Sequence, residues 1–172
     1  MKGTSTFRLT LTALFAALAC VTTMFIRMPS PLGGYVNLGD GFVLLAGFLL
    51  GPIWGGVAAG LGSMLADLLA GYPMYAAGTL IIKGLVALTA GMIFQKLGRD
   101  GLKAIIPAAL CGELLMVAGY FVFSALCLGY GLGAVATIPG DIGQGVAGIA
   151  VSALLTPALM RSHEIREMLD KI

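Results

Sequence analysis

Charged residues are scarce in this chain: they make up 10% of its 172 residues, whereas a soluble domain has about a quarter. Hydrophobic residues make up 59%, and the mean hydropathy is +1.00. This composition excludes a soluble domain and predicts an all-α integral membrane protein. Because a spanning helix needs about 20 apolar residues, the chain has room for about six helices in a single membrane domain over residues 1–172.

Motifs of enzymes and metal sites are also missing. The three cysteines, Cys20, Cys111 and Cys127, lie in apolar runs without CxxC or histidine spacing, which predicts a packing role and no metal site or disulfide. The sequence contains no GxxxxGK[ST] phosphate-binding loop and no GxSxG elbow. We therefore expect no catalytic residues, no cofactor and no nucleic-acid partner, and no use of ATP by this chain itself.

Long apolar runs define the spans. The stretch 42–71 is too long for one helix, and Gly51-Pro52 interrupts it; a proline disfavours helix at the preceding residue and suits the first turn of a new helix. We split the stretch there. The sequence thus predicts six transmembrane helices, at about 8–27, 41–50, 53–71, 75–95, 104–127 and 138–160.

The cations test this topology, because cytoplasmic loops near span ends are enriched in Lys and Arg. With six spans and a cytoplasmic N-terminus, only Arg27 falls outside and Lys83 lies within a span. All other cations fall inside: Lys2, Arg8, Lys96, Arg99, Lys103, Arg161, Arg166 and Lys171. The sequence therefore predicts cytoplasmic N- and C-termini and a long external first loop at about 28–40.

Polar side chains gather toward the external ends of these helices. Ionisable residues inside spans are costly and are candidates for function, and positions three or four apart share a helix face. The first external loop adds its own polar residues beside them. We predict one outward-facing pocket for a compact polar ligand that has hydroxyl groups and an aromatic ring, formed by Asn37, Asp40, Tyr75, Thr79, Lys83, Glu113, Tyr120, Asp141 and Gln144.

Structural roles are alternatives for several of these residues. Asp40 and Asp141 are also placed to cap helix N-termini, and Lys83 is also a partner for Asp67 or Glu113 in a structural ion pair. The two tyrosines suit an interfacial belt. Asp67, near a helix end, is expected to reach toward water and is left out of the predicted site.

The chain resembles the substrate-binding S components of energy-coupling factor (ECF) vitamin transporters. The resemblance rests on an ordered set of segments: the small residues around Ala13 and Ala17, GYVNLGD at 34–40, GFLLGPIWGGVAAGLGSMLADLL at 47–69, IIKGLVALTAG at 81–91 and IPGDIGQGVAGI at 138–149. It implies a six-helix protein of the bacterial cell membrane that binds a vitamin from outside under a lid formed by the first loop. It also implies a transmembrane coupling subunit, docked on Ala13 and Ala17, and two ATPases as partners.

The substrate stays open at this stage. The only tryptophan, Trp54, falls on the inner side, so the outer-side tryptophans of a thiamin-type pocket are missing. The NLGD loop resembles the branch for riboflavin and for pyridoxine or hydroxymethylpyrimidine, and the charged pocket favours the smaller ligands. The competing hypothesis is an autonomous proton-coupled carrier, suggested by Glu113 near the midplane. The two halves of the chain show no repeat of the kind common in complete carriers.

Overall fold

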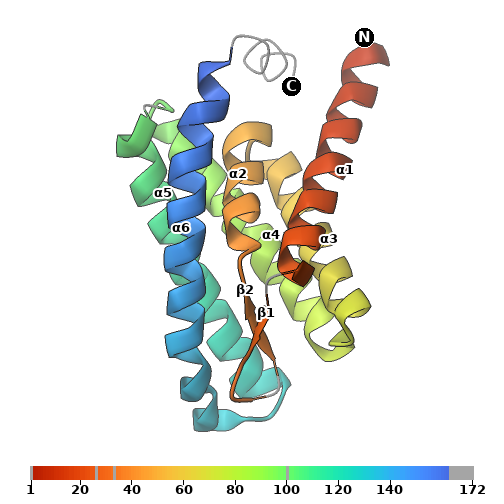
Figure 1. Ribbon diagram of the computed structural model, residues 1–172, viewed down its shortest axis with the longest axis vertical. Coiled ribbons are helices and arrows are strands. Elements are labelled where there is room, and N and C mark those ends of the chain that lie inside the picture. Colours follow the sequence, from red (N-terminus) through yellow and green to blue (C-terminus); the bar gives the residue numbers. More distant parts are fainter. Residues whose placement is uncertain (1, 26, 33, 100, 163–172) are drawn as a thin grey trace.

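The computed structural model describes residues 2–25, 27–32, 34–99 and 101–162. Six α-helices and one short hairpin make up most of this part (Figure 1). In chain order the elements are α1 (Lys2–Phe25), β1 (Arg27–Pro29), β2 (Tyr35–Asn37), α2 (Asp40–Leu50), α3 (Pro52–Ala70), α4 (Pro73–Lys96), α5 (Gly101–Val122) and α6 (Ile138–Arg161). A π-helical turn (Phe123–Cys127) extends α5, and a 3-10 helix (Gly131–Thr137) leads into α6.

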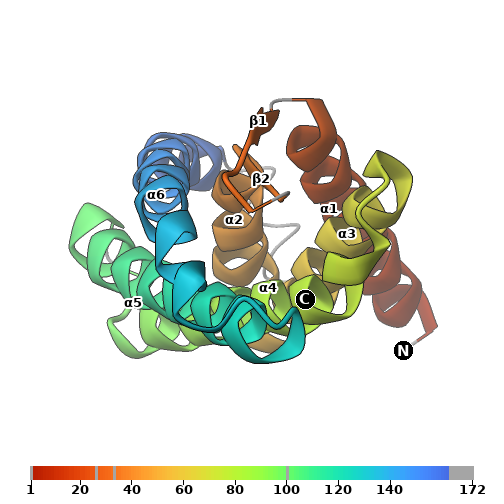
Figure 2. The same ribbon diagram turned by 90° about the horizontal axis from the view of Figure 1, so that it is seen from below.

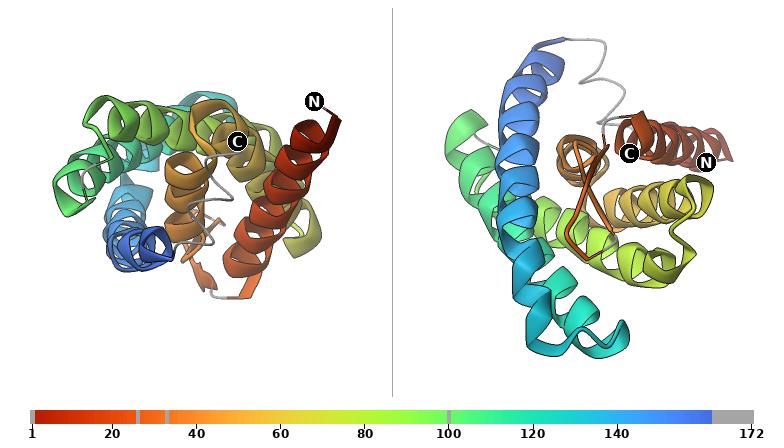
Figure 3. Two further views of the ribbon diagram at one scale, coloured as in Figure 1. Left: turned by 90° about the horizontal axis from the view of Figure 1, so that it is seen from above. Right: turned by 60° about the horizontal axis from the view of Figure 1, so that its bottom comes forward.

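The short helix α2 lies inside the bundle. Every one of its residues except Phe42 is buried, and the view from the end where α1 begins shows the other helices around it (Figure 3, left). Gly51, with a φ of 80°, separates α2 from α3, and Pro52 opens α3. The predicted division of the 42–71 stretch at Gly51-Pro52 is therefore confirmed. A positive φ favours glycine, which explains why the break falls at this residue.

Five helical segments are long and apolar enough to cross a membrane: Thr6–Phe25, Pro52–Ala70, Pro73–Lys96, Gly101–Cys127 and Gly131–Arg161. The helix α2, with 11 residues, is about 16 Å long at 1.5 Å per residue and reaches only part of the way across a hydrocarbon core of about 30 Å. The prediction of six helices is confirmed. One of them, however, is not a full span.

A β-hairpin occupies the part of the bundle that the short helix α2 does not reach (Figure 1). The strands β1 and β2 pair antiparallel, with Arg27 opposite Asn37 and Pro29 opposite Tyr35. Seen from the end opposite the start of α1, the hairpin lies between α1 and α6 (Figure 2). The sequence predicted a loop here, and the strands are too short to give the alternating pattern that reveals a strand.

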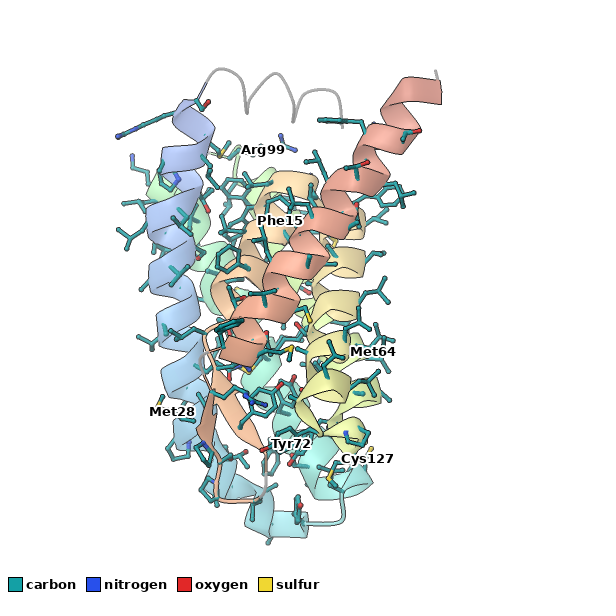
Figure 4. All side chains as sticks on the ribbon, turned by 45° about the vertical axis from the view of Figure 1, so that its right-hand side comes forward. Phe15, Met28, Met64, Tyr72, Arg99 and Cys127 are labelled. Atoms are coloured by element: carbon teal, nitrogen blue, oxygen red, sulfur yellow. The ribbon has the colours of Figure 1, made fainter. Side chains whose placement is uncertain are left out.

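The two ends of the bundle differ in charge. The start of α1 and the end of α6 lie at one end, and the hairpin and the 3-10 helix at the other (Figure 1). Arg99 lies toward the first end, whereas Met28, Tyr72 and Cys127 lie toward the second (Figure 4). The cation-rich end is thus the cytoplasmic end under the positive-inside rule; Arg166 and Lys171, which entered the same count, lie outside the described residues.

Small residues allow the helices to pack closely. A methyl group at Gly60 of α3 would lie 2.6 Å from the carbonyl oxygen of Leu80 on α4, so only glycine permits this approach. Around α2 the core is apolar, and the rings of Phe48 and Phe94 lie 4.7 Å apart. Large apolar side chains such as Leu69 and Leu154 remain exposed, as expected for a surface that faces lipid.

Boundaries differ from the predictions in a few places. The helix α1 begins six residues earlier than the predicted 8–27 and ends two residues earlier. The predicted loop at 128–137 contains the 3-10 helix. The packing role predicted for the cysteines fits only Cys20, because Cys111 and Cys127 are exposed on the outside of the bundle.

Candidate functional site

A pocket opens at the hairpin end of the bundle. Its empty volume is about 490 Å³, including the part open to solvent. The hairpin region, α3, α4, α5 with its π-helical turn, the 3-10 helix and α6 all contribute side chains. Its lining residues are Ser30, Gly34, Tyr35, Asn37, Asp67, Tyr75, Thr79, Tyr120, Ser124, Thr137, Asp141 and Gln144. Such a concave, largely polar site suits a small water-soluble ligand.

One wall joins the hairpin to α3. The hydroxyl group of Tyr35 donates a hydrogen bond of 2.6 Å to Oδ1 of Asp67. The Tyr35 ring also lies 4.9 Å from the Tyr72 ring and 5.7 Å from the Arg27 guanidinium group. Burial raises the pKa of the Tyr35 phenol above its usual range, and the contact with Asp67 raises it further. Tyr35 therefore keeps its proton at neutral pH and remains the donor.

Another part of the lining consists of hydroxyl groups from α4 and α5. Thr79 Oγ1 and the Tyr120 hydroxyl group lie 3.0 Å apart in a hydrogen bond. The ring of Tyr75 packs against that of Phe123 with 6.3 Å between centroids, next to the π-helical turn that carries Ser124. Because π-helical turns inside α-helices occur often at functional sites, this distortion agrees with the location of the pocket.

A chain of polar contacts runs from the pocket into the core. The Gln144 side chain accepts a hydrogen bond of 2.8 Å from the Asn37 backbone N–H and donates one of 2.7 Å to Oδ2 of Asp40. Asp40 forms an ion pair with Lys83, and both side chains are almost fully buried. Lys83 Nζ also lies 5.3 Å from the centre of the Tyr120 ring. The hairpin, α2, α4 and α6 are thus connected through Gln144.

Glu113 lies beside this chain, close to the side chains of Asp40 and Lys83. It exposes 4% of its surface, and neither carboxylate oxygen has a hydrogen-bond partner among the described residues. The side chain packs against Gly145 and Gly148 of α6, where an added methyl group would lie 3.2 Å from Glu113 Cβ and Oε1, respectively. Two buried carboxylates, Asp40 and Glu113, therefore accompany one buried cation, Lys83.

Six of the nine predicted site residues line the pocket: Asn37, Tyr75, Thr79, Tyr120, Asp141 and Gln144. The other three, Asp40, Lys83 and Glu113, are absent from the lining and lie in the core beneath it. Asp40 bonds to Lys83 and Gln144, and the N-cap residue of α2 is Gly39. Asp141 accepts a hydrogen bond of 3.0 Å from Thr137.

Four lining residues are not among the predicted site residues, although Ser30 and Gly34 lie in the predicted external loop: Ser30, Gly34, Ser124 and Thr137. Tyr35 belongs to the quoted loop but was not selected, and Asp67 was set aside as a residue near a helix end. Asp67 did carry a usable signal, because a carboxylate within a span is a functional candidate by default.

The predicted docking residues lie on the outside of α1. Ala13 and Ala17 are both exposed, whereas the neighbouring Ala16 forms the close contact with α3, at Gly62. Packing within the chain therefore leaves the Ala13 and Ala17 face open.

A second cavity lies near the cation-rich end. Trp54, Gln95 and Arg99 line it together with residues of the turn between α2 and α3. Trp54 is thus far from the hairpin-end pocket, in agreement with the prediction that the only tryptophan falls on the inner side.

The fold and the pocket define a class: a small multi-pass helical membrane protein with a polar pocket between its helices and a hairpin. A family model described as "ECF-type riboflavin transporter, S component" matches residues 3–161. The chain belongs to this family of ECF transporter S components. It is therefore a substrate-binding transporter subunit of the cell membrane and not an enzyme, as the sequence predicted.

Individual relatives agree with this assignment. A thiamine precursor transporter, HmpT, from Lactococcus lactis subsp. cremoris is 31% identical over 90% of this chain and 89% of its own length. A protein of Pyrococcus woesei, described as uncharacterized, is 42% identical over 76% of this chain and 86% of its own length. A solved S component of a bacterial ECF transporter shares the fold, with a TM-score of 0.72 and 24% identity, over 90% of this chain and 95% of that one.

Proposed function

We propose that the pocket captures a thiamine precursor of the hydroxymethylpyrimidine type from outside the cell. The observation that carries the proposal is the polar lining at the hairpin end, where carboxylates and phenol groups face one small pocket. The Lactococcus relative, a thiamine precursor transporter, supports the same ligand class. Riboflavin is the second candidate, because the matching family model is of the riboflavin type.

The chemistry of the lining favours the smaller ligand. Asp67 and Asp141 accept hydrogen bonds, which suits the amino and hydroxymethyl groups of such a pyrimidine. Thr79 and Tyr120 share one hydrogen bond, which leaves one of their two O–H groups to donate to a ring nitrogen. The aromatic side chains of Tyr35 and Tyr75 offer flat surfaces for the ring. Riboflavin carries donors too, but its larger ring system and ribityl chain would have to share the same polar groups.

Binding to the purified protein tests this proposal. Isothermal titration in nanodiscs with hydroxymethylpyrimidine, riboflavin, pyridoxine and thiamine is expected to give the tightest binding with hydroxymethylpyrimidine, at a submicromolar Kd. Mass spectrometry of small molecules that copurify with the protein gives an independent identification. Tightest binding of riboflavin selects the second candidate, and failure of all four compounds overturns both.

We further propose that this S component works with a transmembrane coupling subunit and two ATPases. The exposed Ala13 and Ala17 on α1 support a docking face there, since small residues permit close helix approach in membranes. Replacing both by leucine is expected to abolish copurification with the coupling subunit while vitamin binding persists. Leu9 is another exposed residue of α1. Leu9→Ala changes the surface of the same helix without altering Ala13 or Ala17, so it is the matched control.

The competing hypothesis of an autonomous proton-coupled carrier makes a different prediction. Glu113 is its only support, as a buried carboxylate without a hydrogen bond among the described residues. Proteoliposomes that contain this chain alone are expected to bind the vitamin but not to accumulate it under a pH gradient. Accumulation without the partner subunits would favour the carrier.

A further inference from the structure

Asp67 holds an unused hydrogen-bond acceptor at the pocket wall. Its Oδ1 accepts a hydrogen bond from Tyr35. Thr79 also lies close to the carboxylate, but Oδ2 makes no hydrogen bond within the described ranges. The side chain exposes only 4% of its surface, although it lines the pocket. A buried carboxylate oxygen without a donor is costly, since the group loses water and gains nothing in exchange.

The surroundings hold Asp67 in place instead of neutralising it. The Tyr72 backbone N–H donates a hydrogen bond of 2.8 Å to the Asp67 backbone oxygen at the end of α3. On the side-chain side, Tyr35 fixes Oδ1 and is itself held by the Tyr72 ring. The buried cation Lys83 pairs with Asp40 and not with Asp67. The Asp67 carboxylate is therefore held in one orientation by Tyr35, and it forms no ion pair with a cation of the described residues.

We propose that Asp67 is a ligand-recognition residue, and that its Oδ2 accepts a hydrogen bond from an N–H group on a flat nitrogen heterocycle. This inference rests on the proposed function and specifies which part of the ligand the site recognises. Tyr35 acts as a positioning residue. Because it belongs to the hairpin and bonds to Oδ1, it orients the carboxylate and closes this wall at the same time.

Both candidate ligands offer the required donor. Hydroxymethylpyrimidine carries an amino group on its ring, and riboflavin carries an imide N–H on its ring system. A carboxylate accepts either, and hydrogen bonds to charged groups are stronger than neutral ones. Loss of the donor from the ligand should thus weaken binding about tenfold to a hundredfold.

The first test compares ligands on the unmodified protein. Titrations use hydroxymethylpyrimidine and its analogue with hydrogen in place of the amino group, or riboflavin and 3-methylriboflavin if riboflavin is the ligand that binds. At least tenfold weaker binding of the analogue is expected in the relevant pair. Equal binding within a pair overturns the assignment of the N–H donor, whatever the variants do.

The second test repeats the same pair on variants. In Asp67→Asn the preference for the compound with the N–H donor is expected to fall below about threefold, because an amide that keeps its oxygen toward Tyr35 presents its own donor to the ligand. Tyr35→Phe is expected to weaken binding of both compounds by a similar factor and to keep the preference. Ser63→Ala is the matched control, because Ser63 is buried one helical turn before Asp67 and does not line the pocket. It should change neither the affinity for the two compounds nor the preference between them.

The outcomes separate this inference from the proposed function. If the unmodified protein binds neither hydroxymethylpyrimidine nor riboflavin, the proposed function fails. If it binds one of them and Asp67→Asn retains the full preference, the function stands and the role of Asp67 is wrong. Should Asp67→Asn fail to fold, the ligand comparison on the unmodified protein still puts the inference at risk, because equal binding within the pair overturns it.

Discussion

Asp40 and Asp67 are both buried carboxylates, yet their surroundings are opposite. Each oxygen of Asp40 has a partner, Lys83 or Gln144, and the residue does not line the pocket. Asp67 makes one side-chain hydrogen bond, to Tyr35, and its second oxygen is buried at the pocket wall without one. Burial alone therefore does not identify a binding residue in this protein. Two features together set Asp67 apart: an oxygen without a hydrogen bond and a place in the pocket lining, which Asp40 and Glu113 both lack.

The largest effect is expected from Lys83→Met, which removes the cation from beside Asp40. Breaking a buried ion pair on one side typically costs about 3–5 kcal/mol, because the remaining charge is unpaired. Denaturant unfolding in detergent micelles measures the loss. The double variant Lys83→Met with Asp40→Asn should recover much of it, and equal stability of the single and double variants would contradict the structural role of the pair.

Gln144→Ala is expected to affect both regions. It removes the donor to Asp40 and the acceptor for the Asn37 N–H, so we expect a loss of about 1–3 kcal/mol in stability together with weaker vitamin binding. Unfolding and titration measure the two effects. Ser152→Ala, at a buried serine farther along α6, is the control. An unchanged affinity in Gln144→Ala would show that Gln144 stabilises the core without contributing to vitamin binding.

Asp141→Asn is expected to weaken binding by about 1 kcal/mol, less than the loss at the fully buried residues. The side chain is only half-buried, and an asparagine oxygen retains the hydrogen bond from Thr137, so only the charge is lost. Titration against the unmodified protein measures the change. Unaltered binding would return Asp141 to a role at the helix start, as one sequence alternative proposed.

The smallest effect is expected from Glu113→Gln. Its oxygens make no hydrogen bond among the residues that the structure describes, and glutamine keeps the shape of the side chain without a charge. We expect stability to remain the same or to rise by up to about 1 kcal/mol. A loss above about 2 kcal/mol in the same unfolding assay would show that the charge of Glu113 helps to balance Lys83.

Local signals predicted the backbone well. Gly51-Pro52 located the break between α2 and α3, because both residues restrict the backbone in ways that depend on the residue alone. Helical spacing also grouped Thr79 with Tyr75, and Asp141 with Gln144, on shared faces. These pairs depend only on neighbours along one helix.

Contacts between distant segments could not be predicted in the same way. Tyr35 and Asp67 lie 32 positions apart, and their pairing depends on the hairpin, which short strands conceal. The choice among partners for Lys83 likewise depends on where α2 lies in the bundle. Its burial brings Asp40 to Lys83, whereas the sequence suggested Asp67 or Glu113 as partners.

The short length of α2 has a consequence for how the protein is made. A helix of 11 residues is too short to cross the lipid core alone, so during synthesis it must enter together with α3 as a helical pair. Asp40 is then synthesised well before Lys83, which lies 43 positions later. Until α4 arrives, this carboxylate has no cation, and the start of α2 is best accommodated at the membrane surface. The polar core beneath the pocket is thus completed late in biogenesis, once α4 and α6 have joined the bundle.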